Sequence, residues 1–487
     1  MNPTMRASAS NEPRPLQSLD VPEKELVLGL VAPVGARLDE AVQTLVGLLT
    51  SFTYHPEVVR LSDFLKDPSA PPPADAAARM KRSMENGTSR RRATERGDIL
   101  ALQAIKHIHE TYHVDNKLPS TTAFILRSLK HQDEVVALRK VYGSGFFLLG
   151  INASEEERVK QLCEIEGLNL ADATALSARD QSETDELGQQ TRKVFELADF
   201  YVEQRHMTEQ LKRILELLFG HPYIFPEPQE HWMHMAYAAS LRSADLSRQV
   251  GAVVVSARGD LIGIGSNDVP KAFGGPYVPG PQDRRDFQRG GDPNKEHLNR
   301  IVEDVVHRLL GPEHLQEGIA KLERSLLHEI TEYARAAHAE MDALLACARS
   351  GVSTRDSTLY CTTFPCHNCA KHIVAAGVRT VYYIEPYPKS RAITLHNDAI
   401  ALDSCEDKVS FLPFIGVAPR RYVDLFAMKP PAGEPINRKI SDKTWEFSRK
   451  NARLRSSLVP TTYIDREKRA IVELKYADEK AEKRICP

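Results

Sequence analysis

The sequence lacks any long hydrophobic run and has few cysteines for its length. No stretch reaches the roughly 18 consecutive apolar residues that a membrane-spanning helix needs, and residues 1–20 are polar, without an apolar signal-peptide core. The seven cysteines are an odd number at low density, which argues against a disulfide framework. We therefore expect a cytoplasmic protein with no membrane contact and a flexible N-terminal tail.

The sequence also lacks an excess of charge of either sign and is poor in aromatic residues. Lys and Arg total 64 against 66 Asp and Glu, so the net charge argues neither for nor against a nucleic-acid partner. Only 7% of the residues are aromatic, which gives little support for a groove that stacks the bases of a single strand. At 487 residues, the chain exceeds what one hydrophobic core usually serves, so we expect at least two domains.

The N-terminal part shows the alternation of strand and helix that is typical of an α/β domain. Residues 24–32 form a short apolar run suited to a buried strand, and residues 38–49 repeat apolar side chains with helical spacing. Residues 121–129 and 145–151 indicate two more buried strands. A strand, a glycine-containing turn and a helix open a parallel α/β domain, so we predict a doubly wound parallel sheet here.

The turn after the first of these strands is similar to a P-loop that has lost its catalytic residues. A P-loop reads Gly-x-x-x-x-Gly-Lys-Ser/Thr, but Gly29 and Gly35 are one position too far apart. Ala36 stands in place of the lysine and Arg37 in place of the hydroxyl that holds Mg²⁺, so we do not expect phosphoryl transfer. We predict instead that Gly29, Gly35 and Arg37 bind phosphate passively before a helix N-terminus.

The most basic segment of the chain is RRRATERG at 90–97. It is open to three interpretations: a solvated loop, a lid over nucleotide phosphates, or a docking site for RNA.

Four residues at two places in the chain form a pattern with catalytic meaning. His338 and Glu340 lie one residue apart at the start of a predicted helix, and Cys366 and Cys369 lie in a Pro-Cys-x-x-Cys motif. One imidazole and two thiolates are ligands that Zn²⁺ prefers, and three protein ligands leave the fourth tetrahedral position open for catalysis. A carboxylate beside such a site moves protons between water and a leaving group, which is the role we predict for Glu340.

A structural zinc site or a pair of core cysteines is the alternative interpretation. A closed zinc site needs a fourth ligand, and His367 and His372 are candidates, but neither explains the His-x-Glu pair. The combination of His-x-Glu, a spacer and Pro-Cys-x-x-Cys is the signature of zinc deaminases that act on nucleobases. We therefore favour a catalytic zinc site.

The segments LSRQVGAVVV, GSNDVP, HAE and TTFPCHNC resemble the deoxycytidylate deaminase branch of the cytidine deaminase superfamily, over roughly residues 229–415. The resemblance implies a sheet sandwiched by helices, with zinc held between two helix N-termini by His338, Cys366 and Cys369. It also implies that Asn267 contacts the substrate sugar, although a buried turn asparagine is an equally common role.

Further substrate contacts are predicted from chemistry and position. Phosphates need cations or helix N-termini, and a group of cationic and hydroxyl residues surrounds the motifs, although each one alone is more often a solvated surface residue. Two threonines on the strand before Pro-Cys either line the pocket or pack in the core. The residues of these two groups are Arg248, Arg284, Arg285, Lys389, Ser390, Thr362 and Thr363.

A degenerate kinase-like domain fused to such a deaminase-like domain resembles the bacterial anti-phage dCTP deaminases. This resemblance implies hydrolytic deamination of dCTP, together with dCMP, which would deplete dCTP during infection. It also implies a homo-oligomer, with a hexamer as one candidate, and regulation, which in some relatives is by a small RNA. We predict a tail (1–20), a P-loop kinase-like domain (21–219), a linker (220–228), a zinc-dependent deaminase-like domain (229–420) and a C-terminal extension (421–487).

Two alternative functions remain from the sequence alone. A deaminase that edits cytosine in single-stranded nucleic acid would share the zinc chemistry but would need an aromatic, basic groove. A nucleotide-sensing or RNA-sensing regulator would carry an idle deaminase, against which the presence of all four motif residues argues.

Overall fold

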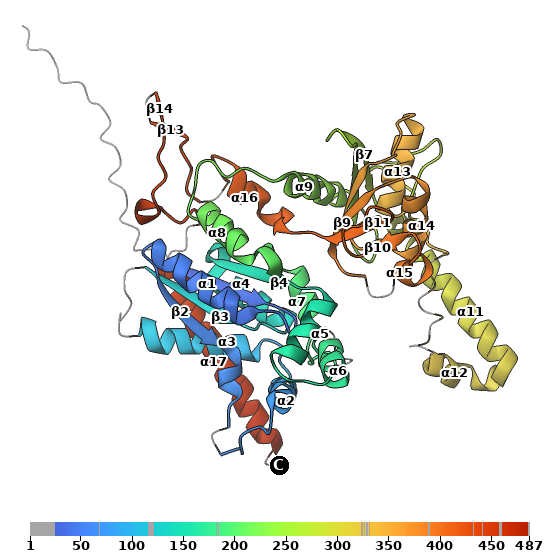
Figure 1. Ribbon diagram of the computed structural model, residues 1–487. Coiled ribbons are helices and arrows are strands. Elements are labelled where there is room, and N and C mark those ends of the chain that lie inside the picture. The colour runs from blue at the N-terminus through green and yellow to red at the C-terminus, as the bar shows by residue number, and fades with distance from the viewer. Residues whose placement is uncertain are drawn as a thin grey trace, which may run out of the picture.

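The computed structural model describes residues 25–485, apart from 68, 115–120, 182, 184, 323–324, 326, 328–329, 331, 388–389, 432, 441 and 457–459. The predicted tail and the predicted substrate residue Lys389 lie outside the described residues. The described chain forms two α/β units side by side, each built on a six-stranded sheet (Figure 1). Within the described residues, none of the helices has the length and apolar character needed to span a bilayer.

The first unit is a doubly wound sheet. Its elements are β1 (Leu26–Val31), α1 (Leu38–Ser51), β2 (His55–Arg60), α2 (Ala76–Thr94), α3 (Ile99–Ile108), β3 (Thr122–Arg127), α4 (Gln132–Tyr142), β4 (Phe146–Asn152), α5 (Glu155–Glu164), α6 (Leu170–Gln181), α7 (Thr191–Glu196), β5 (Phe200–Glu203) and α8 (Met207–Leu218). The strand order is β12-β5-β4-β1-β3-β2, where β12 is Gly416–Val417, and β1 to β5 are parallel.

Helices cover both faces of this sheet because its central strand is apolar throughout. In β1, Leu26, Leu28 and Leu30 pack with α1 and α8, whereas Val27 and Val31 pack with α3 and α4 on the opposite face. The structure therefore confirms the predicted parallel α/β class for this part of the chain.

The second unit is a mixed sheet between helices. Its elements are α9 (Pro228–Ser240), β6 (Gly251–Val255), β7 (Leu261–Ser266), α10 (Asp286–Arg289), α11 (Pro293–Leu310), α12 (Leu315–Leu322), α13 (Ala339–Arg349), β8 (Thr358–Thr363), α14 (His367–Ala375), β9 (Thr380–Glu385), α15 (Ala392–Leu395), β10 (Ile400–Ala401) and β11 (Val409–Pro413). The order is β10-β11-β9-β8-β6-β7, with β6 antiparallel to both of its neighbours and the other pairs parallel.

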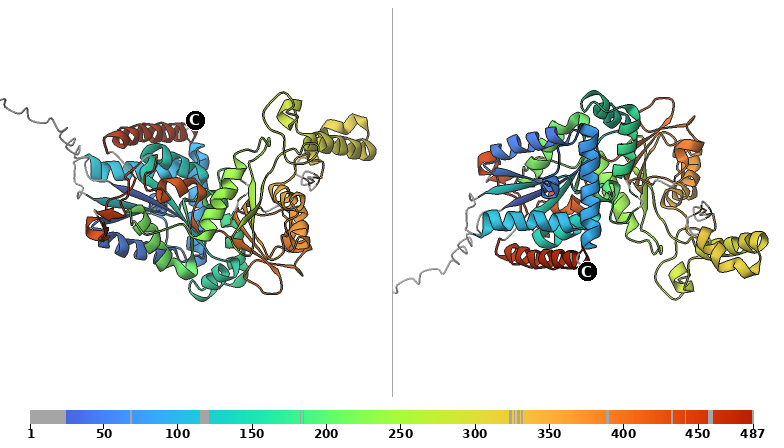
Figure 2. Two further views of the ribbon diagram at one scale, coloured as in Figure 1. Left: turned by 90° about the horizontal axis from the view of Figure 1, so that it is seen from above. Right: turned by 90° about the horizontal axis from the view of Figure 1, so that it is seen from below.

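Alternation along β6 places helices on both faces of this sheet as well. Ala252 and Val254 pack with α13 and α14, whereas Val253 and Val255 face the side covered by α9. The segment between β7 and α13 carries α11 and α12, an arm that projects away from both sheets in each view (Figure 2).

The end of the chain returns to the first unit, which the sequence analysis did not predict. β12 pairs antiparallel with β5, so the predicted domain limit at residue 420 falls after a strand of the first sheet. Beyond α16 (Tyr422–Phe426) and the hairpin of β13 (Lys439–Ile440) and β14 (Lys443–Thr444), α17 (Pro460–Ile485) lies along α3 (Figure 2). Tyr463 and Leu474 of α17 are fully or almost fully buried there.

Residues 90–94 of the basic segment are the end of α2, so the loop interpretation is wrong for them, and residues 95–97 form the turn that follows the helix. Its arginines are paired with carboxylates: Arg90 with Asp478 at 2.6 Å and Arg96 with Glu473 at 2.7 Å, both on α17. Arg91 is fully buried beside Glu134 at 3.7 Å. The basic segment therefore helps to attach α17, and carboxylates of the same chain compensate much of the charge of the segment.

A buried polar cluster fixes α17 at its first turns. Glu467 is fully buried and accepts hydrogen bonds from Tyr142 at 3.0 Å, and its other oxygen lies 2.9 Å from Nδ1 of His109 and 2.7 Å from Nδ1 of His113. We expect Glu467→Gln to lower the free energy of unfolding by about 3 kcal/mol, because it leaves buried partners of a charged group unmatched. Urea denaturation measures this. Glu473→Gln on the same helix, in an exposed pair, should leave stability close to that of the parent.

The same cluster makes stability depend on pH in the alkaline range. Burial alone would lower the pKa of His113, but its hydrogen bonds to Glu25 and Glu467 outweigh burial and raise the pKa from 6.5 to about 9. The folded chain thus holds this proton more tightly, so its contribution to stability is complete below pH 6.5 and is lost as the pH rises through 9. We expect the stability difference between the parent and His113→Asn to shrink between pH 7 and 10, and a constant difference would contradict this assignment.

Candidate functional site

The start of α13 is held against β7 by close backbone contact. A Cβ at Gly265 would lie 2.3 Å from the carbonyl oxygen of Ala339, and a Cβ at Gly263 would lie 2.6 Å from that of Ala343. Only glycine therefore allows the helix to lie this close to the strand. This contact fixes His338, the N-cap residue of α13, and Glu340 in the first turn of the helix.

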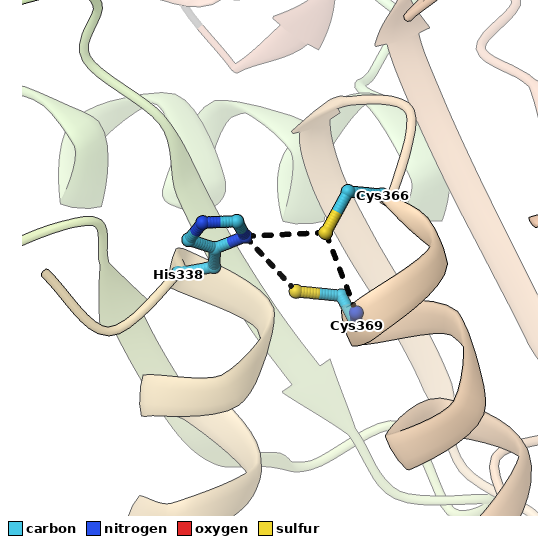
Figure 3. A group of neighbouring side chains, drawn as sticks. All are labelled: His338, Cys366 and Cys369. Carbon is cyan, nitrogen blue, oxygen red and sulfur yellow. Dashed lines mark hydrogen bonds between the residues drawn. The ribbon is translucent and has the colours of Figure 1, made fainter. Parts of the chain in front are cut away.

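The structure brings His338, Cys366 and Cys369 together (Figure 3). Nδ1 of His338 lies 3.3 Å from Sγ of Cys366 and 3.4 Å from Sγ of Cys369. Cys366 is the N-cap of α14, and its sulfur accepts a hydrogen bond from the backbone N–H of Cys369 at 3.5 Å. Two helix N-termini therefore face one point, where they favour negative charge.

The distances within this trio fit a tetrahedral zinc ion. A sulfur ligand at about 2.3 Å and a nitrogen ligand at about 2.0 Å, at a tetrahedral angle, lie about 3.5 Å apart, close to the two nitrogen–sulfur distances in the structure. Both cysteines are buried, and all three ligand atoms lie within 4.8 Å of one another. The three side chains are therefore the right kind and in the right place to hold zinc.

The three side chains also shift one another's pKa values. The hydrogen bond from the Cys369 thiol lowers the pKa of Cys366 to about 3. The hydrogen bond from His338 acts in the same direction, and burial opposes both. The hydrogen bond to Cys366 raises the pKa of His338 to about 9, although burial opposes this. Donation to Cys366 raises the pKa of Cys369. His338 and Cys369 thus keep their protons and donate them to the Cys366 thiolate, and a bound metal ion would displace those protons.

Glu340 lies beside the trio and is 4% exposed. Burial raises the pKa of its carboxyl group, against the attraction of His338. A carboxyl group whose pKa is raised from its ordinary range towards neutrality is suited to accepting and donating a proton in one reaction cycle.

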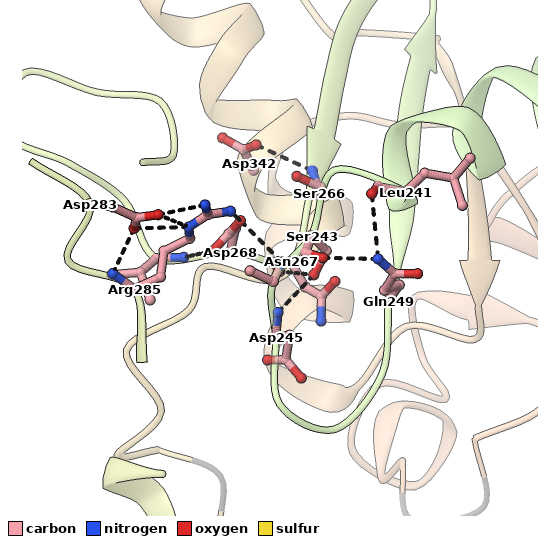
Figure 4. A network of polar contacts seen from close by, with 12 residues as sticks. Leu241, Ser243, Asp245, Gln249, Ser266, Asn267, Asp268, Asp283, Arg285 and Asp342 are labelled. Atoms are coloured by element: carbon pink, nitrogen blue, oxygen red, sulfur yellow. Dashed lines mark hydrogen bonds and ion pairs between the residues drawn. The ribbon is translucent and has the colours of Figure 1, made fainter. Parts of the chain in front are cut away.

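The end of the β6–β7 hairpin forms a polar network that reaches α13 through Asp342, which accepts from the Ser266 N–H (Figure 4). The side-chain oxygen of Asn267 accepts from the Val250 N–H at 2.7 Å, and its amide nitrogen donates to the Arg248 carbonyl at 2.8 Å. Asn267 thus fixes the 248–250 segment, and each end of its amide keeps one further hydrogen-bonding position. The predicted sugar contact stays a prediction.

The other predicted substrate residues have structural partners. Thr362 accepts from the Gly251 N–H at 3.2 Å, and Thr363 donates to Glu385 at 3.2 Å. Ser390 donates to the carbonyl oxygen of Pro365, directly before Cys366, at 2.8 Å. Arg248 is exposed, and its guanidinium lies 5.6 Å from the centre of the Tyr387 ring.

Arg285, in the segment between β7 and α13, has a structural role. It is 6% exposed and forms ion pairs with Asp283 at 2.6 Å and Asp268 at 3.3 Å (Figure 4). Because two carboxylates already compensate its charge, it is poorly suited to bind a phosphate. Arg284 donates to the carbonyl groups of Pro281 and Asp283 and is otherwise exposed at the surface of the same segment.

The turn after β1 is occupied by the chain's own side chains. The N–H of Val34 donates to Asp180 at 2.8 Å, and that of Arg37 donates to Gln204 at 2.8 Å. A Cβ at Gly35 would lie 2.6 Å from the Arg158 carbonyl oxygen, and Gly29 packs against Leu129 and Phe146. Phosphate binding by Gly29, Gly35 and Arg37 would therefore require Asp180 and Gln204 to move.

The structure adds Tyr387, which the sequence analysis did not select, to the surroundings of the site. Tyr387 begins the sequence Tyr-Pro-Lys-Ser (387–390), which contains the predicted substrate residues Lys389 and Ser390. Its position beside these two residues is the feature of the sequence that could have identified it. Its ring is placed under Arg248.

Comparison with known proteins agrees with this geometry. Residues 226–385 match the family described as the cytidine and deoxycytidylate deaminase zinc-binding region. The second unit is therefore a deoxycytidylate deaminase-like zinc-binding domain, as the sequence analysis predicted.

Individual relatives match parts of this chain. The chain is 50% identical to ComE operon protein 2 of Bacillus subtilis over 54 residues, which is 11% of this chain and 29% of that protein. It is 25% identical to the deoxycytidylate deaminase of Mus musculus over 155 residues, 32% of this chain and 63% of that enzyme. The matches thus span less than two thirds of these relatives. The crystal structure of dCMP deaminase from the cyanophage S-TIM5 with dCMP and dUMP aligns with 39% of this chain and 100% of its own, at 23% identity and a TM-score of 0.24.

Proposed function

We propose that the protein hydrolytically deaminates free deoxycytidine nucleotides, dCTP and also dCMP, to the corresponding uracil nucleotides. The observation that carries this proposal is the convergence of His338, Cys366 and Cys369 beside the buried carboxyl group of Glu340. The family match over residues 226–385 supports the same chemistry.

The residues divide the reaction between them. His338, Cys366 and Cys369 would hold zinc, which supplies Lewis acidity and makes water a nucleophile near neutral pH. Glu340 takes a proton from the attacking water and passes protons to N3 of the ring and to the amine on carbon 4 of cytosine, so that ammonia departs and the product carries a carbonyl group at carbon 4 and a proton on N3. The N-termini of α13 and α14 stabilise negative charge that develops at the reacting centre.

The test is a substrate panel with the purified full-length protein. We expect dCTP and dCMP to be converted, and a cytosine-containing single strand of DNA to remain unchanged. Deamination of the strand with both nucleotides untouched would establish the alternative nucleic-acid editing function. The pairing of Arg90 and Arg96 with carboxylates leaves the most basic segment little free charge for a nucleic acid.

We further propose, from the resemblance to bacterial anti-phage dCTP deaminases, that depletion of dCTP protects the cell against phage, and that the protein forms a homo-oligomer, with a hexamer as one candidate. A small RNA is a candidate regulator on the same basis. Measuring nucleotide pools in infected cells with the parent and a Glu340→Gln variant tests the defence role. Equal dCTP levels and equal phage yields in both would rule it out.

Asn267 gives a prediction within this proposal. We expect Asn267→Ala to lower kcat/KM about 10-fold to 100-fold, because the Val250 N–H and the Arg248 carbonyl lose their partner and the adjacent segment loses its position. Zinc content should not change. Asn397→Ala, at an exposed position of the same domain, is the matched control, and equal kinetics in the two variants would show that Asn267 has no role at the site.

A further inference from the structure

A buried cluster in the first unit has the composition of a second metal site. It consists of His109, His113 and Glu467, whose ligand nitrogen and oxygen atoms all lie within 4.8 Å of one another. The two histidines belong to the turn His109–His113, which follows α3, and Glu467 belongs to α17. The cluster shares no residue with the zinc trio, which lies in the second unit. It is therefore independent of the candidate deaminase site.

An unusual helical turn holds the two histidines on one side of the chain. The N–H of Val114 donates to the carbonyl oxygen of His109, five residues earlier, at 3.1 Å, so the segment 109–113 is a π-helical turn. Such turns are rare and occur frequently at functional sites. In this turn, Nδ1 of His109 and Nδ1 of His113 both lie against one carboxylate oxygen, Oε2 of Glu467.

The distances within the cluster indicate which kind of metal ion it suits. Two ligands at about 2.1 Å from a metal ion lie about 3.0 Å apart at a right angle and about 3.4 Å apart at a tetrahedral angle. The two nitrogen–oxygen distances here are 2.9 Å and 2.7 Å, closer to one face of an octahedron. Two imidazoles and one carboxylate on such a face are typical ligands of Fe²⁺, and carboxylates also suit Mn²⁺.

The residues around the cluster complete the pattern of a metal site. Nε2 of His113 lies 3.3 Å from a carboxylate oxygen of Glu25, which also accepts a hydrogen bond from Tyr463. The second oxygen of Glu467 accepts from Tyr142 at 3.0 Å. Metal-binding histidines usually donate their other ring N–H to a carboxylate, and metal-binding carboxylates are usually hydrogen-bonded in turn. Both features are present here.

The charge of the cluster also favours a cation. Glu467 is fully buried and Glu25 is 6% exposed. Among the described residues, neither carboxylate has a lysine or arginine within ion-pair distance, and their charged partners are the two histidines alone. Buried carboxylates without full compensation are costly, and one divalent ion would neutralise both. The side chain of His109 is 10% exposed, so the cluster borders the solvent from which an ion enters.

We propose that His109, His113 and Glu467 bind a divalent metal ion of the Fe²⁺ and Mn²⁺ type, which joins α17 to the first unit. The role of the ion is structural, because its ligands come from segments more than 350 positions apart along the chain. The pH dependence described above for His113 belongs to the metal-free chain, because an ion at Nδ1 displaces the proton there.

Binding is tested with Mn²⁺ alone, added to the zinc-loaded full-length protein and followed by electron paramagnetic resonance. Mn²⁺ prefers oxygen ligands to thiolates, so it should leave the zinc content unchanged. We expect one bound Mn²⁺ per chain and a higher melting temperature in its presence, because an ion that binds only the folded chain stabilises it.

Three variants locate the bound ion. His109→Gln removes one ligand and should weaken Mn²⁺ binding about 100-fold or more and abolish the rise in melting temperature. Glu25→Gln keeps all three ligands and should weaken binding about 10-fold to 100-fold, because Glu25 orients His113. The matched control is His107→Gln, at an exposed histidine of α3, which should bind like the parent. Circular dichroism verifies that each variant is folded.

Two results would overturn the proposal. One is the absence of bound Mn²⁺, and of bound Fe²⁺ under anaerobic conditions, at millimolar concentration of either ion. The other is equal binding by the parent and His109→Gln, which would place the ion elsewhere. A second zinc ion that the parent binds and His109→Gln lacks, with no binding of Mn²⁺ or Fe²⁺, would show that the assigned kind of metal is wrong. None of these measurements involves deamination, so their outcome is independent of the proposed function.

Discussion

Replacing Glu340 with glutamine should reduce deamination of dCTP about 1,000-fold while zinc stays bound. Glutamine keeps the size and hydrogen-bonding shape of the side chain but cannot accept and release the proton that general acid–base catalysis requires. Glu340 is buried and is not one of the three residues that converge on the proposed metal position. Kinetics and elemental analysis of the same preparation measure the two quantities.

The matched control for this substitution is Glu406→Gln, at an exposed position of the same domain. It should retain the parent rate and zinc content. A Glu340→Gln variant with more than a tenth of the parent rate would show that another group moves the proton. A variant that loses zinc along with activity would show that Glu340 contributes to metal binding. It would contradict the proposal that the trio holds the metal while Glu340 only moves protons.

Replacing Cys366 with serine should remove both zinc and activity. The sulfur of Cys366 is the thiolate of the trio, with a pKa lowered to about 3 mainly by the hydrogen bond from Cys369, and a serine hydroxyl is a far poorer zinc ligand. We expect the zinc content to fall from about one ion per chain to less than about a tenth of that value, with no measurable deamination. Dialysis against a chelator, followed by elemental analysis, measures the retained metal.

Cys405→Ser is the control for this second substitution because Cys405 belongs to the same domain and is not one of the trio. It should keep zinc and activity. Full zinc retention by Cys366→Ser would mean that the metal is bound elsewhere. The described part of the chain contains one other cluster with metal-ligand geometry, His109, His113 and Glu467, so zinc content in Glu467→Gln would then be the next measurement.

The chemistry-bearing part of the site could be predicted from the sequence because it is encoded locally. The His-x-Glu and Pro-Cys-x-x-Cys motifs each lie at a helix start, so each short segment fixes the geometry of its own residues. What the motifs could not give is how close the two helices lie. That depends on Gly263 and Gly265 of β7, whose close contact with α13 is a tertiary feature.

The structural roles of the turn after β1 and of the basic segment could not be predicted, because they depend on partners far along the chain. Asp180 reaches the Val34 N–H across 146 positions, and Arg90 pairs with Asp478 across 388. Neither pairing has a periodic or motif signal in the sequence. The same holds for β12, whose two residues are too few to show a strand pattern. The predicted phosphate turn and basic segment thus proved to be largely engaged within the chain.

The most direct test of the central claim is to incubate the protein with dCTP in water enriched in oxygen-18 and to weigh the product by mass spectrometry. Hydrolytic deamination at the His338, Cys366, Cys369 and Glu340 site predicts dUTP with one heavy oxygen in its base, one ammonia released per product, and no product from Glu340→Gln. Unchanged dCTP, or heavy oxygen found only in released phosphate, would contradict it.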